Sequence, residues 1–180
     1  NIQEKIAKQF PEAVFEEGEN LLVNIPDLKW HAHAKMLKEE LHFDFLVTIV
    51  GMDWTDKLGC VYYLQNTDDK SLISVKVTTD DRENPMIHSV HDVWAIATTF
   101  EREVYDFFGI VFIGHPDMRR LFMRTDWVGY PLRKDYDANP ELNPIRLDAE
   151  ENEDDSFVVT EDENGKLTKT DYKIFSENDY

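Results

Sequence analysis

Two carboxylates flank an arginine at Glu101–Arg102–Glu103, and a histidine follows at His115. Glutamate and histidine are residue types that transfer protons in many enzymes, so one hypothesis is a general acid–base site. The spacing argues against it. The surrounding apolar residues repeat at helical intervals, and residues two apart in a helix point to different sides. The two glutamates therefore do not form a catalytic pair, although a free-standing acidic enzyme that uses Glu101, Glu103 and His115 stays an alternative.

Basic and aromatic side chains are concentrated directly after this predicted helix. Residues 119–136 contain five basic and two acidic side chains, although the whole chain has a formal net charge of −18. The basic residues are Arg119, Arg120, Arg124, Arg133 and Lys134. Arginine and aromatic residues are enriched at the energetic centres of protein interfaces, which favours a partner-binding surface. The alternative is a solvated helix end, since Arg102 and Asp106 are spaced to pair along one helix face.

Other polar residues lack the spacing of known sites. His31 and His33 lie two apart on a predicted helix, so they do not share a metal ion, and His88 and His91 straddle a predicted helix start. Surface or half-buried histidines are the simpler interpretation. Cys60 is the single cysteine, so the chain has no internal disulfide and no self-contained iron–sulfur cluster, which needs about four thiolates. Its strand-like surroundings predict a buried, unreactive thiol.

The overall charge excludes several partners. An acidic chain is repelled by nucleic acid and by anionic lipid surfaces. No apolar run approaches the ~20 residues needed to span a bilayer, so no direct membrane span is expected. No signal peptide opens the sequence, and the single cysteine suits a reducing compartment.

Hydrophobic periodicity predicts two or three helices and four strands. The helices are Ile2–Phe10, Leu28–Leu41 with Asp27 as its N-cap, and a third that starts at Ser89 and closes at Gly109. The strands are Asn20–Ile25, Phe43–Val50, Cys60–Gln65 and Leu72–Thr78, the last two forming a hairpin. This order predicts an α+β fold, with a mostly antiparallel four-stranded sheet, helices on one face, and an extended irregular C-terminal segment.

Composition divides the chain into three parts. We expect an α+β domain over residues 1–115, an extended partner-binding segment over 116–147 and an acidic C-terminal tail over 148–180. The tail has 12 acidic and 3 basic residues, which is −9 of the net −18. Its first part, Asp148–Gly165, is predicted to be mobile. An alternative pairs FVVT with YKIF (Tyr172–Phe175) in a hairpin that turns at Asn164–Gly165.

The residue types and fixed spacings after Phe100 resemble a known signature. The order E-R-E-x-x-D-F-F, six residues, His115, three residues and Arg119 resembles the 30 kDa (C) family of subunits of respiratory NADH:quinone oxidoreductase, complex I. The stretches GHPDMRRLFM and GYPLRKDY continue the resemblance, with Tyr130 where the family usually has histidine.

The resemblance implies a non-catalytic subunit of the peripheral quinone-reducing module of a proton-translocating complex, which scaffolds the large hydrogenase-like subunit. It implies no cofactor in this chain, with iron–sulfur clusters and, if present, flavin in partner subunits. It also implies a peripheral position on the cytoplasmic side of the bacterial inner membrane. A subunit of a related membrane-bound hydrogenase or of a ferredoxin/F420 dehydrogenase complex is the alternative.

The resemblance assigns roles to the motif as well. Glu101, Arg102 and Glu103 are expected to order the junction between the domain and the segment after it. The basic residues are expected to meet acidic groups of the partner. The expected motif and interface residues are Glu101, Arg102, Glu103, Asp106, His115, Arg119, Arg120, Arg133 and Lys134.

Overall fold

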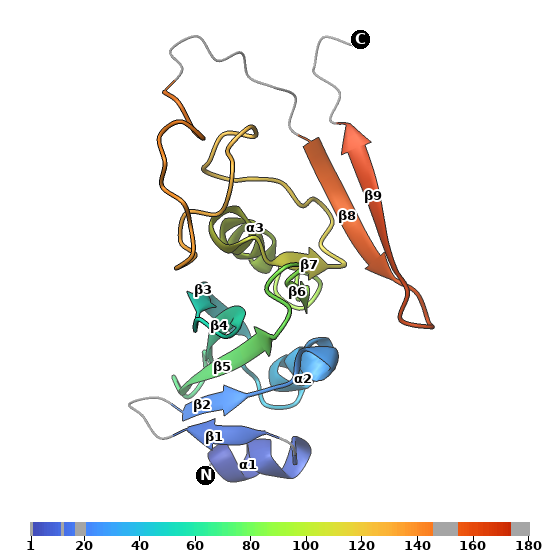
Figure 1. Cartoon of the computed structure of the whole chain (residues 1–180). Coiled ribbons are helices and arrows are strands. Elements are labelled where there is room, and N and C mark those ends of the chain that lie inside the picture. The colour runs from blue at the N-terminus through green and yellow to red at the C-terminus, as the bar shows by residue number, and fades with distance from the viewer. Residues whose placement is uncertain (1, 12, 17–20, 146–154, 174–180) are drawn as a thin grey trace.

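A computed structural model describes residues 2–11, 13–16, 21–145 and 155–173. It has α+β architecture, with a main sheet, a second layer of helices and a C-terminal hairpin beside them (Figure 1). The helices are α1 (Ile2–Gln9), α2 (Asp27–Glu39) and α3 (Ala97–Phe108). The strands are β1 (Val14–Glu16), β2 (Leu21–Asn24), β3 (Phe45–Asp53), β4 (Leu58–Gln65), β5 (Leu72–Thr79), β6 (Met86–His88), β7 (Val111–Ile113), β8 (Asp155–Glu161) and β9 (Leu167–Lys173).

The main sheet has five strands, in the order β1-β2-β5-β4-β3, rather than the four that the sequence predicted. Strands β3, β4 and β5 form the predicted antiparallel meander, but β2 pairs with β5 in parallel, so the sheet is mixed. The prediction missed β1 because three residues are too few to show a period of two. The sequence also started β2 at Asn20, which lies outside the described residues.

Helices α2 and α3 pack on the same face of this sheet. The ring of Trp30 on α2 lies 4.5 Å from that of Tyr62 on β4. On β3, a Cβ added to Gly51 would lie 2.4 Å from the ring of Phe108 on α3. Gly51 is the register partner of Cys60, two residues from Tyr62, so both contacts belong to one face. Trp30, Tyr62 and Cys60 are fully buried there.

The third helix begins eight residues later than the sequence predicted, at Ala97. The preceding segment forms turns, in which the amides of Val93 and Trp94 both donate to the carbonyl of Val90. The Ser89 hydroxyl does not cap a helix, because it donates to Glu101. The predicted end is confirmed, since Gly109 terminates α3 with a φ of +71°.

The second helix also starts differently. Pro26 occupies the N-cap of α2, and Asp27 is the first helical residue. The Asp27 carboxylate instead accepts a hydrogen bond from the backbone N–H of His88 on β6, at 2.8 Å. Asp27 therefore connects two elements rather than capping one.

Strands β6 and β7 form a short parallel pair, and β8 and β9 form an antiparallel hairpin. The hairpin alternative is confirmed for the turn, but FVVT pairs with residues 168–171 rather than with Tyr172–Phe175. The last two of those residues lie outside the described part of the chain. Of the segment predicted to be mobile, residues 148–154 lie outside the described residues and 155–165 belong to this hairpin, and its mobility stays a prediction. Strand β8 docks on the body, where Met118 and Phe157 exchange backbone hydrogen bonds of 2.8 and 3.1 Å.

Candidate partner-binding site

The segment after the third helix, residues 116–145, is called the extension here. It has no regular secondary structure after β7, and one carboxylate on α3 holds its first turn. Asp106 is fully buried. It accepts hydrogen bonds from the amides of Leu121, Phe122 and Met123, at 3.1, 2.6 and 2.9 Å. It also pairs with Arg120 at 3.0 Å. Asp106 thus supplies the acceptors that this stretch of backbone would otherwise lack.

Two arginines continue this connection between α3 and the extension. Arg120 donates to the carbonyl oxygens of Trp127 and Gly129, at 3.0 and 2.9 Å. From α3, Arg102 donates to the carbonyl oxygens of Arg119 and Arg120, at 3.2 and 2.9 Å. The guanidinium groups therefore act as multidentate donors to backbone that has no strand or helix partner.

The later part of the extension is held at the end of β3. Asp53 forms a bidentate pair with Arg82, at 2.8 and 3.1 Å, and also accepts from the amide of Lys134 at 2.9 Å. Arg82 beside it holds the pKa of the Asp53 carboxyl well below its usual range. Arg133 donates to the carbonyl oxygens of Phe108 and Arg82, at 2.6 and 3.2 Å. The C-terminal end of α3 and this loop are thereby joined.

Replacing Asp53 with asparagine should lower the free energy of unfolding by about 1.5–3 kcal/mol at pH 7, because hydrogen bonds to a charged group are lost. The folded-state pKa is depressed, so the charge stabilises the fold above the ordinary value of 3.8. The difference between wild type and variant should therefore be constant above about pH 5 and shrink as the pH falls below 3.8. Urea titrations from pH 3 to pH 7 measure it, and a difference that grows on acidification would contradict the assignment.

Glu101 is fully buried inside the fold. It accepts from the Ser89 hydroxyl at 2.5 Å and from the amide of Val90 at 2.8 Å. Burial raises the pKa of its carboxyl to about 8. Glu103 is half-buried on α3. Glu101 therefore ties the turns before α3 to that helix, a structural role.

His115 is also fully buried. Its Nδ1 accepts from the amide of Asp117 at 3.0 Å, so its Nε2 carries the proton that is donated to the carbonyl of Thr98 at 2.9 Å. Burial lowers the pKa of the imidazole. Both nitrogens are used within the chain, so the ring fixes the start of the extension and is not presented to a substrate.

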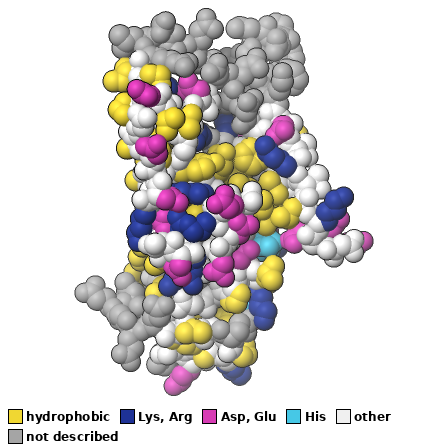
Figure 2. Space-filling model, viewed as in Figure 1, with side chains coloured by type: hydrophobic (Ala, Val, Ile, Leu, Met, Phe, Trp, Pro, Cys, Tyr) yellow, Lys and Arg dark blue, Asp and Glu magenta, His cyan; other side chains and the backbone are white. Residues whose placement is uncertain are grey.

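Several large apolar side chains of the extension point outward, whereas Arg120 and Arg133 bind carbonyl oxygens within the chain. Figure 2 shows hydrophobic side chains gathered over this part of the molecule, at the upper left. The large apolar residues of the extension that are exposed are Phe122 (65%), Val128 (51%), Leu132 (55%), Leu142 (43%) and Ile145 (91%). We call these five the apolar surface. Clustered exposed apolar residues mark interaction sites.

Contacts inside the chain hold the apolar surface in place. The ring of Phe122 stacks on Phe107 of α3, with centroids 5.7 Å apart. The amide of Leu132 donates to the carbonyl of Phe107 at 3.1 Å. Asn143 and Val128 exchange two hydrogen bonds of 2.8 and 3.0 Å. The exposed residues therefore stand on a fixed backbone.

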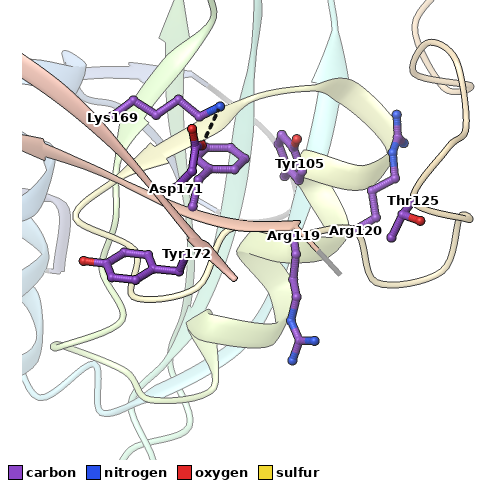
Figure 3. A pocket seen from close by; sticks show the side chains of 8 residues that line it. Tyr105, Arg119, Arg120, Thr125, Lys169, Asp171 and Tyr172 are labelled. Atoms are coloured by element: carbon purple, nitrogen blue, oxygen red, sulfur yellow. Dashed lines mark ion pairs between the residues drawn. The ribbon is translucent and has the colours of Figure 1, made fainter. Parts of the chain in front are cut away.

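A cavity of about 440 Å³ lies between α3, the extension and the hairpin. Its lining includes Arg119, Arg120 and Lys169. Figure 3 shows the two guanidinium groups pointing in opposite directions. Lys169 pairs with Asp171 at 3.0 Å (Figure 3). The positive groups do not converge, so the cavity is not built as an anion site.

The structure thus divides the residues that the sequence singled out. Glu101, Arg102, Asp106, His115, Arg120 and Arg133 form internal contacts. Arg119, which pairs with Asp117 at 3.0 Å, and Lys134, which donates from Nζ to Thr55 at 3.0 Å, lie nearer the surface. We therefore assign Arg120 and Arg133 to the framework of the extension rather than to contacts with partner carboxylates.

Sequence reasoning missed the Asp53–Arg82 pair and the apolar surface. The pair joins residues far apart in the sequence, which no local pattern reveals. The apolar surface left one signal, namely single large apolar residues spaced irregularly among the prolines of the extension.

The histidines and the cysteine are placed in other contacts. His31 bonds to Asp92 at 2.9 Å, and His33 to the carbonyl of Lys29 at 2.6 Å. Within the described residues, no three His, Cys, Asp or Glu side chains are grouped as metal ligands. Cys60 is buried, which raises the pKa of its thiol. None of the described helices is long and apolar enough to cross a bilayer.

Comparisons with known proteins identify the family of the chain. Residues 23–141 match the family described as "Respiratory-chain NADH dehydrogenase, 30 Kd subunit". The C/D subunit of the NADH-quinone oxidoreductase of Phocaeicola vulgatus is 46% identical over 159 residues, covering 88% of this chain and 30% of that protein. The C subunit of the NADH-quinone oxidoreductase of Geotalea uraniireducens is 36% identical over 150 residues, covering 81% and 90%. The chain thus spans 30% of the length of the C/D relative.

A solved structure has the same fold. A chain in the "Structure of the membrane-bound sulfane sulfur reductase (MBS), an archaeal respiratory membrane complex" superposes with a TM-score of 0.69 and 27% identity. The superposition covers 85% of this chain and 95% of that one. The motif and its spacing, the matched family and these relatives agree, and the chain belongs to the family of the 30 kDa subunit of respiratory-chain NADH dehydrogenase, as the sequence predicted.

Proposed function

We propose that the chain is a non-catalytic subunit of the peripheral quinone-reducing module of a complex I-type NADH:quinone oxidoreductase. In this role it supports electron transfer to quinone by scaffolding the large hydrogenase-like subunit. The observation that carries the proposal is the apolar surface, which stands on a rigid extension in a chain of this family.

The construction of the extension supports a permanent partner. A loop that becomes ordered only on binding has a lower affinity, because its loss of conformational entropy opposes binding. A preorganised loop does not have this cost. Asp106, Asp53 and the inward arginines fix the extension before any partner arrives. Permanent interfaces are also more apolar than transient ones. The apolar surface therefore fits the large subunit as its partner better than a passing contact.

The chemistry of the chain supports a role without its own redox group. Its single thiol is buried in the sheet, and electron-transferring clusters need several thiolates. We propose that the partner subunits carry the clusters and any flavin, and that this chain is held peripherally on the cytoplasmic side of the membrane through the complex.

A second candidate is a subunit of a related membrane complex with another electron donor or acceptor. It is favoured by the superposition with a chain of the archaeal sulfane sulfur reductase complex. A free-standing enzyme is disfavoured, because Glu101 and His115 are each 0% exposed and no substrate reaches them. The two complex-type candidates differ in activity, so the purified complex should reduce quinone with NADH under the first and fail to do so under the second.

Leu132→Asp and Ile145→Asp are expected to weaken binding to the co-expressed large subunit about 30-fold or more each, since a hot-spot truncation costs ~2 kcal/mol or more. The melting temperature of the isolated chain should barely change, because both side chains are exposed, by 55% and 91%. Leu28→Asp is the matched control, with an 85% exposed leucine on α2, and should bind normally. Affinity capture with a tagged chain measures the binding of each variant, and thermal unfolding of the isolated chain measures its melting temperature. Equal binding by all three variants would place the interface elsewhere.

A further inference from the structure

His88 connects three separate elements through one ring. It ends β6, and its Nδ1 lies 3.2 and 3.3 Å from the carboxylate oxygens of Asp27 at the start of α2. Its Nε2 lies 2.7 Å from Oε2 of Glu161, the last residue of β8. The histidine side chain is 19% exposed and the Glu161 side chain 31%. His88 is thus a partly buried link between the body of the fold and the hairpin.

The two contacts require a protonated ring. A neutral imidazole donates from one nitrogen and presents a lone pair on the other, while an ionised carboxylate only accepts. With a carboxylate on each nitrogen, one contact would be repulsive in the neutral form. Asp27 and Glu161 are the charged groups that face the ring. The arrangement is therefore complete only when His88 is an imidazolium.

The other polar attachments of the hairpin among the described residues lie farther from its turn. The amide of Gly114 donates to the carbonyl of Val159 at 2.7 Å, and Met118 pairs with Phe157. Ser156 donates to the Asp117 carboxylate. All of these involve residues 156–159, so the Glu161 contact is the polar link nearest the turn of the hairpin. Strand β9 lies on the outside, with residues 167–172 exposed.

The hairpin supplies half of the wall of the 440 Å³ cavity beside α3. Phe157, Lys169, Asp171 and Tyr172 come from the hairpin, and the other four lining residues come from α3 and the extension (Figure 3). The ring of Phe157 packs against that of Tyr105 on α3, with centroids 5.6 Å apart. Movement of the hairpin would therefore open the cavity along one side.

We propose that charged His88 is a clasp that holds the turn end of the β8–β9 hairpin on the body, in addition to the contacts of residues 156–159, so that the hairpin is fully docked only while His88 holds a proton. This proposal concerns a property other than the scaffolding role, and it does not depend on that role. The clasp makes the docking of this end of the hairpin sensitive to proton concentration.

The direction of the pH dependence follows from the two carboxylates. They raise the pKa of His88 from 6.5 to about 9, and the Asp27 contact is the larger cause. A raised folded-state pKa means that the stabilisation is complete below the unfolded value of 6.5 and is lost as the pH rises through about 9. The turn end of the hairpin should therefore be held at neutral pH and loosened in mildly alkaline solution.

Nuclear magnetic resonance of the full chain tests the clasp. The His88 ring protons report its protonation, and the Val159 methyl groups, which are 4% exposed, report hairpin docking. Both signals should titrate together with a midpoint near pH 9. In Glu161→Gln, both midpoints should fall toward 6.5, because one carboxylate is lost. In His88→Gln, the pH-dependent change at Val159 should disappear.

The control uses another ion pair of the hairpin, Lys169 with Asp171. Lys169 and Asp171 are 57% and 78% exposed, so Asp171→Asn should leave both midpoints near pH 9. Two results would overturn the proposal. One is a Val159 signal that stays constant while His88 titrates. The other is a His88 midpoint near 6.5 in the wild-type chain.

Discussion

Replacing Asp106 with alanine is expected to lower the free energy of unfolding by about 3–5 kcal/mol, the range for removal of one partner from a buried ion pair. The carboxylate is 0% exposed and receives hydrogen bonds from three consecutive amides as well as from Arg120. Its removal leaves a guanidinium and three N–H groups without this acceptor around a fully buried position. Urea unfolding of the isolated chain measures the loss.

Asp126→Ala is the matched control for this loss. Asp126 belongs to the same extension and pairs with Arg124 at 2.9 Å, with side chains 27% and 33% exposed. Partly solvated pairs of this kind contribute about 1 kcal/mol or less. The loss of unfolding free energy in Asp106→Asn should lie between those of Asp106→Ala and Asp126→Ala. The asparagine amide keeps one acceptor oxygen but loses the charge. Equal stability of Asp106→Ala and Asp126→Ala would show that the extension does not depend on the buried carboxylate.

Trp94→Ala should lower the free energy of unfolding by a similar ~3–5 kcal/mol, for a different reason. Trp94 is 4% exposed, stacks on Trp30 with ring centroids 6.5 Å apart, and donates from its indole to the carbonyl of Phe43 at 3.1 Å. Truncation leaves a cavity between α2 and the segment before α3. Thermal or urea unfolding of the isolated chain measures the effect.

Trp94→Phe separates the two contributions. Phenylalanine keeps one aromatic ring but loses the hydrogen bond and some volume, so the expected loss is smaller, about 1–3 kcal/mol. Because neither variant changes the apolar surface, assembly with the partner at low temperature should be preserved. A Trp94→Ala variant as stable as wild type would mean that the core can close around the missing ring.

The sequence predicted the elements that are long enough to show a period. Strand β4 alternates Leu58, Cys60, Tyr62 and Leu64 toward the core, and all four are fully buried. Gly109 marked the end of α3 because the residue after the helix adopts a left-handed backbone conformation, which glycine adopts without strain. The start of α3 was misplaced because Val90, Val93 and Trp94 are buried at helical spacing although they lie in turns. Burial, not helix formation, produced that pattern.

The sequence singled out the extension but did not predict how it is built. A high density of arginine and aromatic residues predicted a partner-binding segment, and that role stays a prediction. The sequence could not show that the guanidinium groups of Arg120 and Arg133 turn inward, because the carbonyl oxygens that they satisfy belong to a loop with no repeating pattern. Long-range polar contacts such as Asp53 with Arg82 depend on the finished fold.

The junction between α3 and the extension also limits which sequences this fold tolerates. Gly109 has a φ of +71°, and a Cβ there would lie 2.4 Å from the ring of Tyr130. Two guanidinium groups lie over that ring, with Arg120 5.1 Å and Arg133 5.0 Å from its centroid. Asparagine, which can adopt the backbone angle, is still excluded by the ring. A side chain at position 109 therefore requires a smaller residue at position 130. In evolution, the substitution at 130 would have to come first.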